Sequence, residues 1–464
     1  MASERAYYKG EGLLGLVFTP LGIRGIFGKD LTTLDVLTIT NSFGRLLGEG
    51  STVVLGRDTR SSSPLVSKAA SAGLLSAGVN VINVGIAPTP TIEWAVDFLG
   101  ADGGVIVSAS HNPPEWNALK LLGERGILIS PEDSKRIKED YLNGKFGCVS
   151  WNEVGDEAET DVIGDYIAAI LSLVDVDAVR EAGLKVVLDP NGGAGSIVTP
   201  YLLREMKVEL TTLNSVPGIF CRELEPRPDA LGDLANLVRA INADVGFAHD
   251  TDADRLALVT EKGEVVPEDV TLALVVEKVL KERRGGTLVV NIASSRMFDD
   301  LAEKYGGKIV RVPVGEVYVA RKMLELSADV GGEGSCGGVI YPELHYGRDG
   351  PLAAAMILER LAKEGKRLSE LIAELPQYVT MRGSVSGEVN WGTLRETLLR
   401  LSKEMSIVGV SELDGIRLDS EDFWVLVRPS RTEPKIRIVV EAKDKSTAEK
   451  LFNKFVKIVR DYVS

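Results

Sequence analysis

Three aspartates at alternate positions give the strongest chemical signal in this sequence. Asp250, Asp252 and Asp254 follow residues 244–248, a mostly apolar run that predicts a strand. Carboxylates gathered in a loop supply the oxygen ligands that Mg²⁺ prefers, and Arg255, directly after them, could hold a phosphate beside the ion. The same spacing opens an EF-hand, but Arg255 stands where that loop needs glycine and the flanks predict strands. A solvated acidic loop is the remaining alternative.

A second candidate is Ser110, which lies just after the β-branched run 105–107. Pro113 and Pro114 end the strand, so Ser110 is expected at a strand's carboxyl end, where open α/β sheets bind ligands. An ordinary turn explains the segment equally well. No G-x-S-x-G elbow surrounds Ser110. Since adjacent side chains diverge on an extended segment, His111 is not expected to act as its base. Phosphoryl transfer beside a metal ion fits better than hydrolysis.

Further polar groups lie in or near loops, each with a simpler alternative. Lys120 could carry a proton to or from a sugar hydroxyl, or be a solvated lysine. Glu333 and Ser335 stand among glycines that let a ligand approach the backbone, or form a flexible loop. A turn rich in cations and hydroxyls could cradle a phosphate, or be a basic hairpin; its residues are Arg428, Ser430, Arg431, Thr432 and Arg437.

Composition restricts the class of protein. The chain has 464 residues, 53 basic against 67 acidic, and a net charge of −14, which opposes nucleic-acid binding. Cations are therefore expected to be concentrated in one cleft, formed by Arg24, Arg57, Arg60, Lys120, Arg255 and Arg428. The three cysteines suit neither a disulfide framework nor a zinc site. No apolar run approaches the ~18 residues of a membrane span, and the N-terminus lacks a secretory signal's apolar core. We expect a cytoplasmic protein without a membrane or nucleic-acid partner; a homo-oligomer is compatible with the sequence.

Strands and helices alternate through three cycles and then change in style. This order predicts three similar mixed α/β domains with mostly parallel sheets and a smaller C-terminal α+β domain, arranged around a central cleft. The expected boundaries are 1–152, 153–257, 258–374 and 375–464. One candidate loop falls in each domain directly after a predicted strand, so the four loops could form one composite site. A helix capped at Ser130 and a final helix with a capping box from Ser446 to Glu449 are also expected.

Taken together, these motifs resemble those of the α-D-phosphohexomutase family, the phosphomannomutase, phosphoglucomutase and phosphoglucosamine mutase enzymes. The resemblance covers nearly the whole chain in order. It implies that Ser110 is a phosphorylated nucleophile, that Ser110 and the three aspartates bind magnesium, and that Lys120 works in acid–base catalysis, with His111, Arg24 and Arg255 in the same catalytic set. It further implies a sugar-binding loop at Glu333 and Ser335 and a phosphate-binding loop from Arg428 to Thr432, while Arg24 ends an N-terminal motif.

The sequence departs from the family pattern at several positions. Residues 18–21 read Phe-Thr-Pro-Leu where the family usually has F-G-T-x, and Thr251 and Cys336 stand where glycine is common. Gly337 replaces a histidine found in many members, and Arg431 replaces a glycine. His345 is a hypothetical substitute for the missing histidine, in the substrate-binding set.

The resemblance implies a mutase that moves phosphate between positions 1 and 6 of a hexose. It would work through phosphoserine 110 and a bound 1,6-bisphosphate, with Mg²⁺ as cofactor and hexose 1,6-bisphosphate as activator; the C-terminal domain would close over the sugar phosphate. A phosphoglucosamine mutase is the nearest alternative, favoured weakly by Ser108 at the start of the serine loop. A metal-dependent sugar phosphatase with Asp250 as nucleophile, and a non-catalytic sugar-phosphate-binding protein, are alternatives from other classes.

Overall fold

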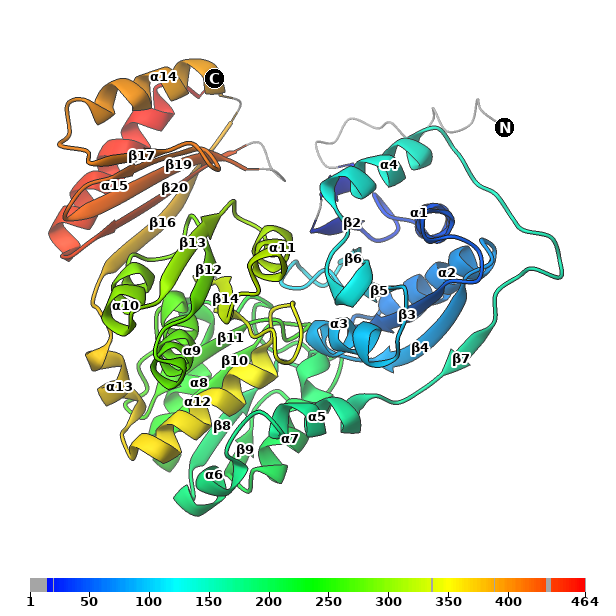
Figure 1. Ribbon diagram of the computed structural model, residues 1–464, viewed down its shortest axis with the longest axis horizontal. Helices are drawn as coiled ribbons and strands as arrows, with labels where there is room; N and C mark the ends of the chain where they lie inside the picture. The colour runs from blue at the N-terminus through cyan, green and yellow to red at the C-terminus, as the bar shows by residue number, and fades with distance from the viewer. Residues whose placement is uncertain (1–14, 20, 335–336, 388, 431–434, 464) are drawn as a thin grey trace.

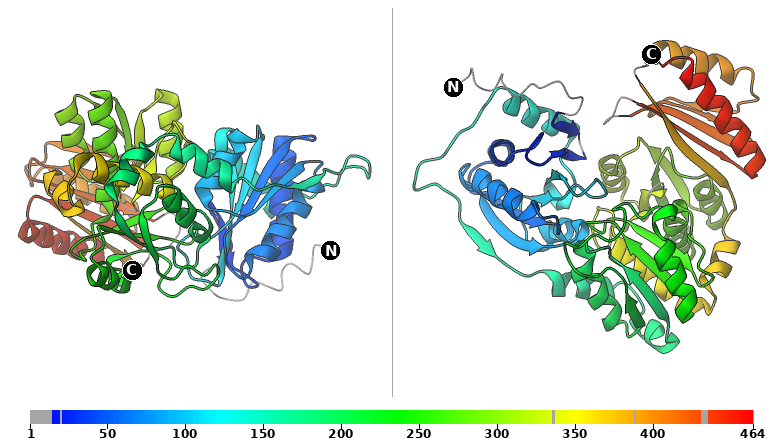
Figure 2. Two further views of the ribbon diagram at one scale, coloured as in Figure 1. Left: turned by 90° about the horizontal axis from the view of Figure 1, so that it is seen from below. Right: turned by 180° about the vertical axis from the view of Figure 1, so that it is seen from behind.

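Four domains, each built around one β-sheet, form an arc whose two ends are the N-terminal and C-terminal domains (Figures 1 and 2). The computed structural model describes residues 15–19, 21–334, 337–387, 389–430 and 435–463. The expected fold class is confirmed, because three mixed α/β domains precede a smaller antiparallel domain. We call them domains I to IV in chain order.

Domain I contains a seven-stranded sheet in the order β1-β2-β6-β5-β3-β4-β7. β3 pairs in parallel with β4 and β5, and β4 with β7, while the other neighbours are antiparallel. Thr32 caps α1 in a capping box with Asp35, and Ser130 caps α4 as expected. The strands are β1 (Val17–Thr19), β2 (Gly22–Ile26), β3 (Thr52–Arg57), β4 (Asn80–Ile86), β5 (Gly103–Val107), β6 (Trp116–Leu122) and β7 (Glu157–Glu159). The helices are α1 (Thr33–Leu47), α2 (Ser63–Leu75), α3 (Thr89–Phe98), η2 (Glu124–Gly126) and α4 (Pro131–Leu142).

Domain II has a four-stranded sheet in the order β11-β10-β8-β9, with only the β10–β11 pair antiparallel. Every residue of β10 is buried, as expected of a strand covered on both faces. Its strands are β8 (Lys185–Asp189), β9 (Glu209–Thr212), β10 (Val245–His249) and β11 (Leu256–Thr260). Its helices are α5 (Ile163–Leu171), α6 (Val176–Ala182), η3 (Ala194–Ile197), α7 (Thr199–Glu205), η4 (Pro228–Ala230) and α8 (Gly232–Ile241).

Domain III repeats this design with the order β13-β12-β14-β15, in which only β14 and β15 are antiparallel. The strands are β12 (Thr287–Asn291), β13 (Lys308–Val312), β14 (Val330–Glu333) and β15 (Gly338–Ile340). The helices are α9 (Glu268–Arg283), α10 (Met297–Tyr305), α11 (Glu316–Leu326), α12 (Gly350–Glu364) and α13 (Leu368–Glu374).

Domain IV is an antiparallel sheet in the order β16-β20-β19-β18-β17 with two helices on it. Its strands are β16 (Val379–Ser386), β17 (Gly409–Ser411), β18 (Ile416–Asp419), β19 (Phe423–Pro429) and β20 (Lys435–Ala442). Its helices are α14 (Trp391–Ser402) and α15 (Lys445–Arg460). The expected cap of the final helix is wrong: Asp444 caps α15 by accepting from the Thr447 amide, so the helix begins one residue before Ser446.

Two strands do not follow the expected domain boundaries. β7 pairs with β4 of the first sheet although it follows residue 152, and β11 spans the boundary at residue 257. Both are edge strands, and their place is set by pairing that local sequence does not reveal.

Domains I, II and III share one continuous hydrophobic core. It runs from Trp94 of domain I through Tyr166 and Phe247 of domain II to Leu272 of domain III. Domain IV has a core of its own. A small apolar cluster joins it to domain III; the members are Ile292, Ala293, Trp424, Leu426 and Val439. Three domains are therefore packed as one body, and the fourth is attached through a smaller contact. Among the described residues, no helix combines the length and apolarity needed to cross a bilayer.

Candidate active site

Ser110 lies in the loop between β5 and β6, with its hydroxyl aimed at domain II. Its Oγ donates a hydrogen bond to Asp250 Oδ2 at 2.7 Å. The backbone at Ser110 is left-handed, with φ of 48°, which a non-glycine residue adopts only when its surroundings hold it there. The Ser110 amide donates to Ser108 Oγ at 3.0 Å, which fixes the turn. The side chain is 6% exposed.

The buried guanidinium of Arg60 holds this loop in place. It donates to the carbonyls of Ser110, Asn112, Pro113 and Trp116, and its Nε donates to Asp58 Oδ2 at 3.0 Å. The expectation that Arg60 is a cleft cation is therefore wrong, because its donors are used by backbone carbonyls inside the domain. Arg57 also lies elsewhere, in a separate pocket described below.

The three aspartates follow β10 in one buried cluster, as a metal site requires. One oxygen from each of Asp250, Asp252 and Asp254 lies within 4.8 Å of the others, and all three residues are 0% exposed. The Oδ1 atom of each is buried without a hydrogen-bond partner, whereas each Oδ2 accepts at least one hydrogen bond. Buried carboxylate oxygens without donors are costly unless a cation binds them. The cluster therefore fits a magnesium ion.

The charges of the cluster are unequal. Burial, reinforced by Asp254 and Asp252, raises the pKa of Asp250 well above its usual value. Burial alone would raise the pKa of Asp252 too, but Lys120, Thr89 and Arg348 together outweigh it, so the pKa of Asp252 is lowered. A divalent cation at the Oδ1 atoms would relieve the repulsion that Asp250 experiences.

Lys120 lies on β6 and joins domain I to the cluster. Its ammonium donates to Asp252 Oδ2 at 2.8 Å, to Asp254 Oδ2 at 3.3 Å and to Thr89 Oγ1 at 3.3 Å. Burial alone would lower the pKa of Lys120, but the two carboxylates raise it. In this arrangement Lys120 keeps its proton and neutralises the carboxylates, and it would have to leave both before it could accept a proton.

His111 and Arg255 meet beside Ser110. The His111 Nδ1 atom lies 3.4 Å from Ser110 Oγ and accepts from Arg255 Nη2 at 2.9 Å. The expectation that the two adjacent side chains diverge is wrong, because the left-handed turn at Ser110 brings them together. Since a guanidinium only donates, Nδ1 is occupied as an acceptor. Arg255, followed by burial, lowers the pKa of His111 well below its usual value, so the ring is neutral. Arg24 on β2 donates to Asn112 Oδ1 at 3.1 Å in the same loop.

Arg348 connects the aspartate cluster to domain III. Its Nη2 donates to Asp254 Oδ2 at 2.6 Å, its Nε donates to Glu316 Oε2 at 2.9 Å, and its Nη1 lies 3.5 Å from Glu333 Oε2. Glu333, at the end of β14, also accepts from the Gly315 amide at 2.8 Å and from Asn291. One buried guanidinium thus links the metal-binding loop to the expected sugar-binding loop.

His345 is buried and has both ring nitrogens in hydrogen bonds. Its Nδ1 accepts from the Gly347 amide at 2.9 Å, so its Nε2 carries the proton donated to Asp349 Oδ2 at 3.0 Å. Asp349 in turn caps α12. This arrangement explains His345 as a residue that orders the start of α12, and it gives no support to its expected role as an acid–base or substrate-binding group.

The described part of the expected phosphate loop, Arg428 to Ser430, lies at the end of β19, where that strand pairs with the start of β20. Arg428 is paired with Arg437 across the hairpin and donates to Asp414 Oδ2 at 3.3 Å. The Ser430 amide donates to the Lys435 carbonyl at 2.8 Å. Ser335, Arg431 and Thr432 lie outside the described residues.

Comparison with known proteins identifies the family. Four successive segments match the domains of the phosphoglucomutase/phosphomannomutase family: residues 15–147 match alpha/beta/alpha domain I, 164–263 domain II, 267–379 domain III and 389–458 the C-terminal domain. The chain belongs to this family. Its members are phosphomutases, which are intramolecular phosphotransferases, and this chain is an enzyme of that class.

Individual relatives match this chain over nearly its full length. A phosphoglucomutase/phosphomannomutase of Thermococcus kodakarensis is 40% identical over 97% of this chain and 99% of its own. A probable phosphoglucosamine mutase of Methanopyrus kandleri is also 40% identical, over 96% of this chain and 98% of its own. The crystal structure of a phosphoglucomutase/phosphomannomutase family protein from Burkholderia thailandensis superimposes with a TM-score of 0.85 at 28% identity, covering 95% of this chain and 96% of that one.

Several residues of this phosphomutase site were not found by sequence reasoning. Thr89, at the start of α3, donates to Asp252 Oδ2 at 2.7 Å, and its only sequence signal is a hydroxyl between two prolines after a strand. The glycine turn before η3 packs closely against the aspartate loop, since a Cβ at Gly193 would lie 2.5 Å from the Thr251 carbonyl oxygen. Glu316 and Arg348 follow no motif that we recognised.

Proposed function

We propose that this enzyme interconverts hexose 1-phosphate and hexose 6-phosphate, in the manner of a phosphomannomutase/phosphoglucomutase, through a phosphoserine at Ser110 and a bound 1,6-bisphosphate. The observation that carries the proposal is the 2.7 Å hydrogen bond from Ser110 Oγ to Asp250, beside three carboxylates with unpartnered oxygens. A serine hydroxyl next to such a cluster is placed for phosphoryl transfer, which depends on positioning and on neutralising charge.

In the proposed first step, a hydroxyl of the sugar monophosphate attacks the phosphorus carried by Ser110. The bond from phosphorus to Ser110 Oγ breaks, a bond from phosphorus to the sugar oxygen forms, and the hydroxyl proton ends on Oγ. The product is a 1,6-bisphosphate. After the bisphosphate reorients within the site, its other phosphate is transferred back to Ser110 by the reverse step.

The residues around Ser110 have different roles in the proposed transfer. Asp250, Asp252 and Asp254 would hold Mg²⁺, which supplies charge neutralisation to the transferring group. Lys120 keeps two of these carboxylates neutralised and in position. Arg255 and Arg24 add positive charge beside the serine loop, and Glu333 is placed on the domain III side to accept hydrogen bonds from sugar hydroxyls.

Replacing the nucleophile tests the proposal directly. Ser110→Ala should abolish turnover of glucose 1-phosphate while calorimetry still detects binding of that sugar phosphate. Ser134→Ala, a buried serine on α4 of the same domain, is the matched control and should keep normal turnover. Turnover at the wild-type rate in Ser110→Ala would refute the assignment of the nucleophile.

The hexose itself is a separate question, because relatives of equal similarity carry different names. Relative kcat/KM on the phosphates of mannose, glucose and glucosamine decides it. A preference for glucosamine phosphate above the other two would make the chain a phosphoglucosamine mutase, which is the alternative reading.

Phosphopeptide mapping separates the mutase from a phosphatase. A label on Ser110 after incubation with glucose 1,6-bisphosphate supports the mutase and the role of the bisphosphate as activator. An acid-labile label on Asp250 would indicate a metal-dependent phosphatase, and bisphosphate binding without turnover would indicate a binding protein. The cytoplasmic location, the lack of a nucleic-acid partner and the homo-oligomer stay predictions.

A further inference from the structure

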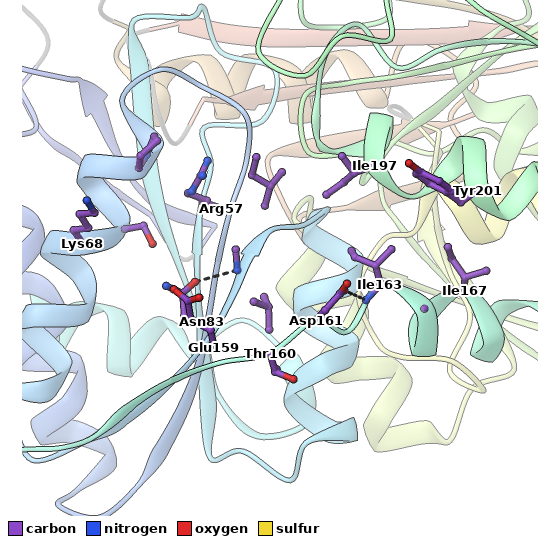
Figure 3. Close-up of a pocket in the computed structure, with 16 residues that line it drawn as sticks. Arg57, Lys68, Asn83, Glu159, Thr160, Asp161, Ile163, Ile167, Ile197 and Tyr201 are labelled. Carbon is purple, nitrogen blue, oxygen red and sulfur yellow. Dashed lines mark hydrogen bonds between the residues drawn. The ribbon is translucent and has the colours of Figure 1, made fainter.

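A large pocket lies at the junction of domains I and II (Figure 3), and its lining does not include the aspartate cluster. The pocket is open to solvent, and its volume of about 910 Å³ leaves room for a small organic molecule. Domain I supplies the ends of β3 and β4 and the start of α2, and domain II supplies α5, η3 and α7. None of the residues that line it belongs to the candidate active site.

The domain I side of this junction pocket carries two cations, Arg57 and Lys68. The half-buried Arg57 donates to the backbone carbonyl of Asp58 at 3.2 Å, and Lys68 is exposed. Within the described ranges neither side chain forms an ion pair with a carboxylate. Two acidic residues also line the pocket: Glu159, paired with Asn83 across the β4–β7 ladder, and Asp161, whose carboxylate accepts from the Ile163 amide at 2.9 Å (Figure 3).

The opposite side of the junction pocket is apolar. Ile163, Ile167 and Ile197 line it together with Tyr201, whose side chain is 54% exposed (Figure 3). Isoleucine side chains offer no hydrogen bonds, so a ligand against this wall must present apolar surface. A rigid aromatic ring such as that of Tyr201 favours contact with another flat, apolar group.

We propose that the junction pocket binds a small organic anion with an apolar or aromatic body. Its anionic group would lie between Arg57 and Lys68, and its body would pack on the isoleucines and Tyr201. A hexose phosphate suits the pocket poorly, because its hydroxyls would face isoleucine side chains without partners. The site is therefore distinct in chemistry from the candidate active site, where the three aspartates lie among Lys120 and several guanidiniums.

The probe for this proposal is 8-anilinonaphthalene-1-sulfonate, which combines an anionic group with aromatic rings and fluoresces when its rings leave water. Titration of the full chain should give saturable binding at one site. Saturating glucose 1-phosphate should not displace the probe, because the sugar phosphate binds elsewhere. Displacement by the sugar phosphate would place the probe in the active site and overturn the proposal.

Variants on the two sides of the pocket test the assignment of each side. Lys68→Glu and Tyr201→Ala alter exposed side chains, and each should weaken binding by about tenfold or more, as expected for the loss of one well-placed charge or ring contact. Lys135→Glu on α4 and Trp151→Ala are matched controls, because Lys135 and Trp151 are highly exposed and lie outside the pocket. Equal binding by all four variants, or weak unsaturable binding by the wild type, would contradict the proposal.

Discussion

Arg348→Met is the perturbation whose outcome the structure defines best. The guanidinium lies among three carboxylates, with hydrogen bonds to Asp254 at 2.6 Å and Glu316 at 2.9 Å and an ion pair to Glu333 at 3.5 Å. Only 10% of its side chain is exposed, and Asp254 and Glu316 are at most 5% exposed. Methionine keeps most of the volume and removes the charge, so the variant isolates electrostatics from packing.

Removing one partner of a buried ion pair leaves the other charge without compensation, at a cost of about 3–5 kcal/mol. For a body of several domains, each kcal/mol lowers the melting temperature by about 2–4 °C. We therefore expect Arg348→Met to melt roughly 10 °C below the wild type in EDTA. Mg²⁺ should recover part of this loss, because a divalent cation at the cluster compensates the charge of Asp254, which has lost its partner.

The assay is thermal unfolding with EDTA and with saturating Mg²⁺, applied to wild type, Arg348→Met and a surface control. Arg395→Met is the control, because Arg395 pairs with Glu412 at the surface, 42% exposed, where such pairs contribute little. The decisive quantity is the Mg²⁺-induced rise in melting temperature, which should be larger in Arg348→Met than in the other two proteins. An equal rise in all three, or a variant as stable as wild type in EDTA, would refute the electrostatic reasoning.

Two further substitutions test the charges of the site. Glu93 on α3 is 2% exposed and its Oε2 has no hydrogen-bond partner; burial, reinforced by Glu316, raises the pKa of this carboxyl well above its usual value. A raised folded-state pKa contributes stability that is present below the unfolded pKa of about 4.5 and is lost as the pH rises through the folded-state pKa. Glu93→Gln should therefore become increasingly more stable than wild type as the pH rises. Parallel curves of unfolding free energy against pH for the two proteins would contradict the raised pKa of Glu93. Asp252→Asn removes one charged ligand, so the Mg²⁺ affinity measured by calorimetry should fall by more than about tenfold, since even changes to residues behind the ligands cost about 10–100-fold. The control Asp97→Asn, on the exposed face of α3, should bind Mg²⁺ normally. Unchanged Mg²⁺ affinity in Asp252→Asn would place the ion elsewhere.

The sequence was enough to locate the candidate groups that lie together in one loop directly after an apolar strand. Asp250, Asp252 and Asp254 are close in sequence, and β10 before them is apolar at nearly every position, so their convergence needs no long-range contact. Ser110 was found for the same reason, because β5 is buried along its whole length and ends before two prolines. Strand ends set the position of both groups.

The predictions that were wrong or missing depend on contacts between residues far apart in sequence or on local backbone geometry. Arg348 of domain III donates to Asp254 of domain II, 94 residues earlier in the chain, and no periodicity in the sequence predicts this contact. The sequence predicts Arg60 as a ligand-binding cation, but in the structure it donates to backbone carbonyls of a loop 50 residues later in the chain. His111 was judged from an extended backbone, whereas Ser110 is left-handed. Charge and spacing indicate what a residue could bind, and the tertiary fold decides which partner it meets.

The distribution of contacts among the domains bears on how a bisphosphate could turn over without escaping. Ser110, the aspartates and Glu333 come from domains that share one core and are joined by the bonds of Lys120 and Arg348, so three walls of the site are fixed relative to one another. Domain IV meets domain III through a small apolar cluster around Trp424 and through polar contacts such as that of Arg417 with the Ile292 carbonyl at 2.6 Å. Hinge motions use interfaces of this smaller kind. In the proposed mechanism, domain IV is thus the part that can close over the sugar while it reorients. A disulfide or cross-link that fixes domain IV to domain III should then slow turnover without changing the proposed phosphorylation of Ser110.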